Sequence, residues 1–102
     1  MQLRITGMSG NVPAATREFV KRRVAFAIAR FENRIARVSV RLDDSSGPRM
    51  GLDKRCRIRA WLQPSGQIVA EVFDSKVDSA VARAADRLER GLRRELEHRH
   101  RD

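Results

Sequence analysis

The chain has 102 residues, of which 41% are hydrophobic and 34% charged, so it can form one globular domain with a single modest core. Its formal net charge is +9, and nearly all of the basic excess is arginine, with 19 Arg against 3 Lys. The planar guanidinium group matches phosphate, so this composition favours a polyanionic partner. The length excludes a second domain, and the short apolar runs exclude a membrane-spanning protein.

The first half of the chain predicts a strand, a helix and a second strand. Residues 2–6 alternate between apolar and polar side chains, which is typical of a strand. Pro13 suits the first turn of a helix, and the helical period of apolar residues continues to about Asn33. Residues 37–42 alternate again and predict the second strand. The apolar stripe of the helix consists of Thr16, Val20, Val24, Ala27 and Phe31.

The second half predicts a hairpin followed by a second helix. Residues 43–53 are rich in turn formers and predict a loop. Residues 54–62 alternate over their whole length, and the sequence PSG at 64–66 predicts a turn into a strand over 67–73. A helix follows from about Ser75. Its apolar stripe consists of Val77, Val81, Ala84, Leu88 and Leu92.

These elements follow one another in the order β-α-β-β-β-α. Because helices are needed to cover an apolar sheet face, we expect a two-layer α+β fold. Its four-stranded sheet should carry both helices on one face. We assign residues 1–96 to this single domain and residues 97–102 to a basic, flexible tail.

Basic residues line the side of the second helix that lies almost opposite its apolar stripe, when each residue turns about 100°. Like charges at these spacings weaken a helix by roughly a few tenths of a kcal/mol per pair. Phosphate contacts, which also release counterions, can offset that cost. A merely solvated face is the alternative, because Asp86 can pair with Arg90 and Glu89 with Arg93. We interpret this basic stripe as a surface for a phosphate backbone; its members are Lys76, Arg83, Arg87, Arg90 and Arg94.

Two further surfaces are candidates for RNA contact. On the first helix, Arg22, Arg23 and Arg30 lie on a flank beside the apolar stripe. The outward side of the sheet is the rival site, because it combines basic and aromatic side chains. A general RNA-binding module that uses this sheet face is therefore the alternative function, and an acidic protein partner is a third possibility. The sheet residues are Arg37, Arg41, Arg55, Arg57, Arg59, Trp61 and Phe73.

The sequence offers no residues for catalysis, so we expect neither an enzyme nor a cofactor or small-molecule substrate. Cys56 alternates inward on its strand, and no histidine is placed to activate it. His98 and His100 have no cysteine or acid cluster that would complete a metal site. The single cysteine and the lack of a secretion signal at the N-terminus predict a cytoplasmic protein.

Three segments, "MQLRITG", "REFVKRRVAFAIARFENRIARVSVRL" and "ADRLERGLRRE", together resemble the ribosome hibernation-promoting factor and ribosome-associated inhibitor family. This family is also called the sigma-factor modulation proteins, and the resemblance covers nearly all of the chain. It implies a bacterial protein that binds the small ribosomal subunit under stress. It also implies that the protein occupies the channel of messenger and transfer RNA and blocks translation there.

The resemblance further implies that basic residues of both helices and the adjoining strands contact ribosomal RNA. The chain departs from the family at Asp78, where a tyrosine is common, and at Ala82, where an acid is common. Because the chain ends soon after the second helix, we expect no C-terminal dimerisation domain. The residues implied to bind RNA are Arg22, Arg23 and Arg30, then Arg83, Arg87, Arg90 and Arg94, with Lys54, Arg55 and Arg57 as weaker candidates.

Overall fold

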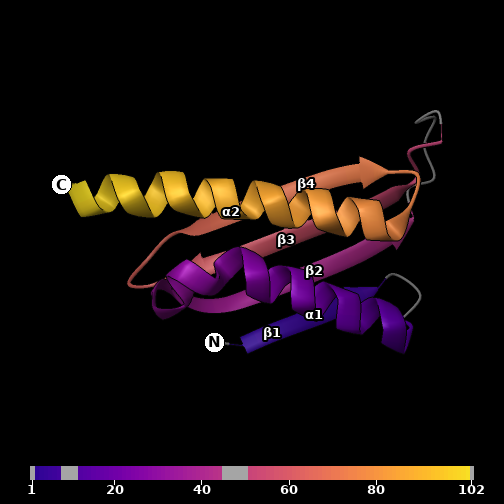
Figure 1. Cartoon of the computed structure of the whole chain (residues 1–102), viewed down its shortest axis with the longest axis horizontal. Helices are drawn as coiled ribbons and strands as arrows, with labels where there is room; N and C mark the ends of the chain where they lie inside the picture. The colour runs from indigo at the N-terminus through magenta and orange to yellow at the C-terminus, as the bar shows by residue number, and fades with distance from the viewer. Residues whose placement is uncertain (1, 8–11, 45–50, 102) are drawn as a thin grey trace.

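The computed structural model describes residues 2–7, 12–44 and 51–101, with the side chains of 98–101 excepted. Its elements follow the predicted order β-α-β-β-β-α, with one short 3-10 helix added, and the α+β fold is confirmed. Both helices lie on the same side of the sheet (Figure 1). The elements are β1 (Gln2–Gly7), α1 (Ala14–Ile28), η1 (Ala29–Arg34), β2 (Ile35–Asp44), β3 (Lys54–Leu62), β4 (Gln67–Asp74) and α2 (Val77–Arg101).

The four strands form one sheet in the order β1-β2-β3-β4. The β1 and β2 strands are parallel, as expected when a helix connects two neighbouring strands. The other two pairs are antiparallel, and a tight turn joins β3 to β4. Gly66 in that turn has a φ of 99°, a backbone conformation that side chains other than glycine rarely adopt. In this strand order, β1 and β4 are the edges of the sheet.

The apolar stripes predicted from the sequence form the core between the sheet and the helices. On β3, Cys56, Ile58, Ala60 and Leu62 are all buried, and their outward neighbours are all more exposed. The helices α1 and α2 lie over this face of the sheet (Figure 1), and their apolar stripes belong to the same buried cluster. Every helix residue predicted to face inward is buried except Thr16 and Val77, which are half-buried; the buried ones are Val20, Val24, Ala27, Phe31, Val81, Ala84, Leu88 and Leu92.

The first predicted helix divides into two parts. The α-helix ends at Ile28, and a 3-10 helix continues the chain to Arg34, where one helix to about Asn33 was expected. A 3-10 turn is tighter than an α-turn, and such turns are frequent at helix ends. Phe31 in the 3-10 helix and Ile35 at the start of β2 are both buried in the core.

The predicted loop over 43–53 was wrong at its start. Asp43 and Asp44 belong to β2, where they pair with Arg55 and Lys54 of β3. Residues 45–50 of that loop lie outside the described residues. The backbone of α2 continues to Arg101, so the helix includes most of the segment that the sequence assigns to a tail.

Candidate nucleic-acid interface

The basic stripe of α2 lies on the exposed side of the helix. All five of its side chains are exposed. Among the described residues, Arg90 and Arg94 form no ion pair, and neither does Lys76. The acid expected beside Arg90, Asp86, turns away from it toward α1, whereas the predicted pair of Glu89 with Arg93 does form. Lys76, Arg90 and Arg94 therefore have no acid among the described residues that neutralises their charge.

Two members of the stripe instead reach the free edge of the sheet. Arg83 donates from Nη1 to the carbonyl oxygen of Phe73 at 3.3 Å and to Oδ2 of Asp74 at 3.1 Å. Arg87 donates from Nη1 to the carbonyl oxygen of Glu71 at 3.0 Å. These bonds cover carbonyl groups that an edge strand would otherwise leave open to another strand. The carboxylate of Asp74 neutralises Arg83, and the hydrogen bond from Arg83 lowers the pKa of Asp74.

The arginines of the α1 flank differ in their partners. Arg23 donates from Nη2 to Oδ1 of Asp86 at 3.2 Å and to the carbonyl oxygen of Ala82 at 3.3 Å, so it ties α1 to α2. Nη2 of Arg30 lies 3.8 Å from Oε1 of Glu97. Arg22 is exposed and has no ion pair with any described residue. Two acids of α2 thus pair with Arg23 of α1 and Arg30 of η1, and Arg90 and Arg94 of the basic stripe keep no acid partner among the described residues.

The basic residues at the start of β3 are held by their own chain. Nζ of Lys54 lies 2.8 Å from Oδ1 of Asp44, and Nε of Arg57 lies 2.9 Å from Oε2 of Glu71. Arg55 donates from Nη2 to Oδ2 of Asp43. These pairs join neighbouring strands, so Lys54, Arg55 and Arg57 contribute less free charge than the sequence suggests.

Asp43 is the buried acid of this network, and its side chain is only 3% exposed. Burial raises the pKa of Asp43, but the hydrogen bonds and positive charges of Arg55 and Arg41 outweigh burial and leave the pKa below its usual value. Asp43 was not among the site residues predicted from the sequence. A signal was present, because Asp43 continues the outward alternation of Arg37, Ser39 and Arg41.

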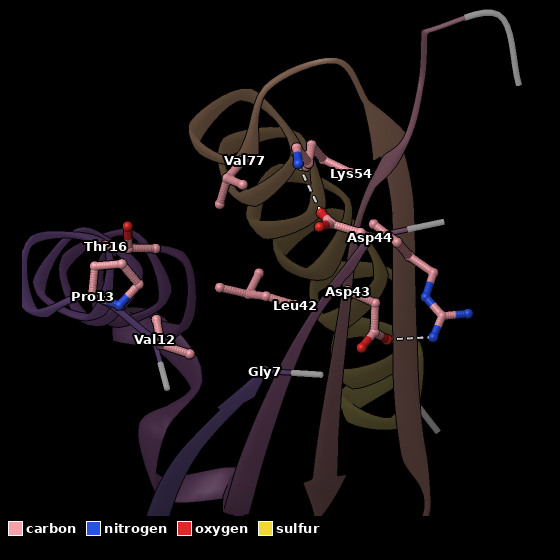
Figure 2. A pocket seen from close by; sticks show the side chains of 11 residues that line it. Gly7, Val12, Pro13, Thr16, Leu42, Asp43, Asp44, Lys54 and Val77 are labelled. Carbon is pink, nitrogen blue, oxygen red and sulfur yellow. Dashed lines mark hydrogen bonds and ion pairs between the residues drawn. The ribbon is translucent and has the colours of Figure 1, made fainter. Parts of the chain in front are cut away.

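A pocket of about 550 Å³ opens between the first turns of α1 and α2, at the end of the sheet (Figure 2). Val12, Pro13 and Val77 line its apolar part. Its charged lining residues are the two pairs Asp44–Lys54 and Asp43–Arg55, so each acid is already neutralised by a base. Among the described lining residues, none is a histidine or cysteine that could act as a base or nucleophile.

No three potential metal ligands come together in the part of the chain that the structure describes, although the side chains of His98 and His100 lie outside that part. Burial of Cys56 raises the pKa of its thiol to about 12, so the thiolate needed for nucleophilic attack does not form near neutral pH. None of the described helices is long and apolar enough to cross a bilayer.

Solved structures of two other proteins resemble this fold. Comparison with curated proteins gives no match. Among solved structures, the N-terminal domain of Protein Y from Thermus thermophilus matches with a TM-score of 0.76 and 25% identity, over 93% of this chain and 99% of that one. A ribosomal subunit interface protein from Coxiella burnetii matches with a TM-score of 0.70 and 18% identity, over the whole of both chains, which supports the fold.

The sequence itself carries the family assignment. Residues 3–100 match the family described as sigma 54 modulation protein / S30EA ribosomal protein. The match spans all the strands and helices described above, apart from the ends of β1 and α2. The chain therefore belongs to the sigma 54 modulation protein / S30EA ribosomal protein family.

Proposed function

We propose that this protein associates with the ribosome and binds small-subunit ribosomal RNA in the channel of messenger and transfer RNA, where it blocks translation. Family membership supports a ribosomal partner, and one structural relative is named a ribosomal subunit interface protein. Such a partner would place the protein in the cytoplasm. The family consists of binding proteins, which confirms the prediction that this protein is not an enzyme.

The observation that carries the proposal is the unmatched charge of the basic stripe. Arg90 and Arg94 are exposed, lie one turn apart on α2 and have no acid partner among the described residues. Arg87 adds a charge that a backbone carbonyl binds but does not neutralise. Lys76 and, on α1, Arg22 are also exposed and unpaired within the described chain. Unpaired cations of this kind contribute most to binding affinity when they contact phosphate groups, because each contact releases counterions.

The decisive variant is the double substitution Arg90→Gln and Arg94→Gln, which removes two charges without breaking any ion pair between described residues. We expect it to weaken co-sedimentation with small ribosomal subunits. The slope of log affinity against log salt should also fall by about 1.4 to 1.8, because each lost phosphate contact removes roughly 0.7 to 0.9. Circular dichroism should show an unchanged fold.

A charge-matched control is the double substitution Arg4→Gln and Arg37→Gln. These two arginines are exposed on β1 and β2, on the opposite face of the protein. It removes the same two charges and should weaken ribosome binding less than the Arg90 and Arg94 variant does. An equal loss in both variants would mean that only net charge matters, and it would overturn the helix-face site. Normal binding by the Arg90 and Arg94 variant would overturn it as well.

A further inference from the structure

The sheet has a second face that neither helix covers. Alternation along the strands brings six arginines to this face: Arg4 from β1, Arg37 and Arg41 from β2, and Arg55, Arg57 and Arg59 from β3. Only two acids of the four strands lie on the same face, Asp43 and Glu71. This open face is therefore strongly basic, independently of the stripe on α2.

The two acids neutralise only one side of the open face. Asp43 binds Arg41 and Arg55, and Glu71 binds Arg57. The remaining arginines, Arg4, Arg37 and Arg59, have no ion pair with any described residue. Nε of Arg59 is also buried without a hydrogen-bond partner in the described chain, so this nitrogen lacks an acceptor. The unmatched charge is therefore gathered around the end of β3 that carries Trp61.

Trp61 gives this charged region an aromatic centre. The guanidinium carbon of Arg37, its cross-strand neighbour, lies 3.9 Å from the centre of the indole ring, and that of Arg59 lies 5.6 Å from it. A cation over an aromatic ring at such distances is attracted by the ring electrons. Together Arg37 and Trp61 present stacked planar groups at the surface, to which a planar ligand can add.

Beside Trp61 the open face is hollowed. The hollow has a volume of about 190 Å³. Guanidinium groups and hydroxyl groups converge on it, and both are donors that phosphate oxygens accept. Its lining residues are Thr6, Ser39, Arg41, Arg57, Arg59 and Trp61.

We propose that the open face is a binding site for single-stranded nucleic acid, with a backbone phosphate in the hollow and a base stacked on the Arg37–Trp61 pair. Charge complementarity supports this occupant, because the face holds six arginines against two acids. A second copy of the chain would bring like charges together. An acidic protein would match the charge but would have no specific use for the stacked planar groups. Single strands use both features at once, since arginines track the phosphates and aromatic rings hold the bases.

Trp61 provides a direct test, because the chain has one tryptophan and no tyrosine. Tryptophan fluorescence therefore reports on this face alone. We expect a short oligouridylate to quench it with saturation, and added salt to reverse the quenching. Inorganic phosphate should bind far more weakly, because it offers no base to stack. A lack of quenching by the oligonucleotide, or equal quenching by polyglutamate, would overturn the proposal, and the second result would identify an acidic protein as the partner.

Variants locate the site and separate it from the helix face. Arg59→Gln should lower the slope of log affinity against log salt by about 0.7, the value for one contact to a single strand. Arg59→Lys, which keeps the charge, should restore most of that slope. Trp61→Ala, measured with a labelled oligonucleotide, should weaken binding roughly 5- to 150-fold.

The Arg90→Gln and Arg94→Gln variant is the control for net charge, and it should weaken oligonucleotide binding less than Arg59→Gln does, although it removes one charge more. A loss of binding in that control, with normal binding by Arg59→Gln, would overturn the sheet site. The proposal does not rest on the ribosomal function: the oligonucleotide assay can succeed when ribosome binding through α2 fails, and the reverse.

Discussion

Gly91 allows α2 to pack closely on the edge strand of the sheet. A Cβ atom added at this position would lie 2.9 Å from Cγ2 of Ile68. Non-bonded carbon atoms prefer separations of roughly 3.5 to 4.0 Å, so an alanine here would force the helix or the strand to shift. Cγ2 of Ile68 is attached directly to the β-carbon, so it cannot move away without a change of the whole side-chain rotamer.

Two opposing effects decide the consequence of the substitution Gly91→Ala. Glycine inside a helix costs about 1 kcal/mol relative to alanine, so helix propensity alone favours the change. Overpacking of a close contact costs about 1 to 3 kcal/mol. Because the gap is well below contact distance, we expect overpacking to win, and Gly91→Ala should lower the free energy of unfolding by about 1 kcal/mol.

Urea denaturation followed by circular dichroism measures this effect, and a second background isolates its cause. Ile68→Ala removes Cγ2, so in that background Gly91→Ala should raise the free energy of unfolding by about 1 kcal/mol, the full propensity gain. The sign of the glycine substitution should thus reverse between the two backgrounds. If Gly91→Ala stabilised the otherwise unaltered protein, the close approach of α2 to β4 would not be a constraint.

Two further predictions concern buried titratable groups. Asp43→Asn should lower the free energy of unfolding at pH 7 by about 1 to 3 kcal/mol, because Arg41 and Arg55 lose their charged acceptor. The folded-state pKa of Asp43 lies below its unfolded value, so its stabilisation is present above the unfolded value and is lost as pH falls through the folded pKa. Urea denaturation should therefore show that the free energy of unfolding falls more between pH 7 and pH 3 in the unaltered protein than in the asparagine variant. An equal fall in both proteins would contradict this assignment. Cys56, whose thiol pKa burial raises to about 12, should react with a thiol reagent at pH 8 only once urea unfolds the chain; rapid reaction of the native protein would show that the thiol is accessible.

The sequence predicts the fold well because alternation and helical periodicity report directly on burial. The strand over 54–62 was predicted to the residue, since its alternation is uninterrupted and a turn follows it. Asp43 and Asp44 were misplaced in a loop because acids resemble turn formers. Their strand conformation depends on Arg55 and Lys54, which are near in space but distant along the chain.

The candidate site was harder to predict than the fold, because the sequence shows charges but not their partners. Local spacing suggested that Asp86 serves Arg90 on the same helix. In the structure Asp86 binds Arg23 of α1, 63 residues away, and Arg90 is left unmatched. Which arginine an acid binds depends on how the two helices pack against each other. Spacing along one helix therefore predicts where a charge points, but not whether another element neutralises it.

Arg83 and Arg87 show why the members of the basic stripe are not equivalent. Both belong to it by position, yet both hold carbonyl groups on the free edge of β4. A glutamate at residue 83 would place a carboxylate beside Asp74 and expose edge carbonyls, which favours pairing with strands of other molecules. Loss of ribosome binding in such a variant would mix damage to the edge with loss of a phosphate contact. Arg90 and Arg94 have no such second role among the described residues, so a change in binding there reports on the proposed RNA surface alone.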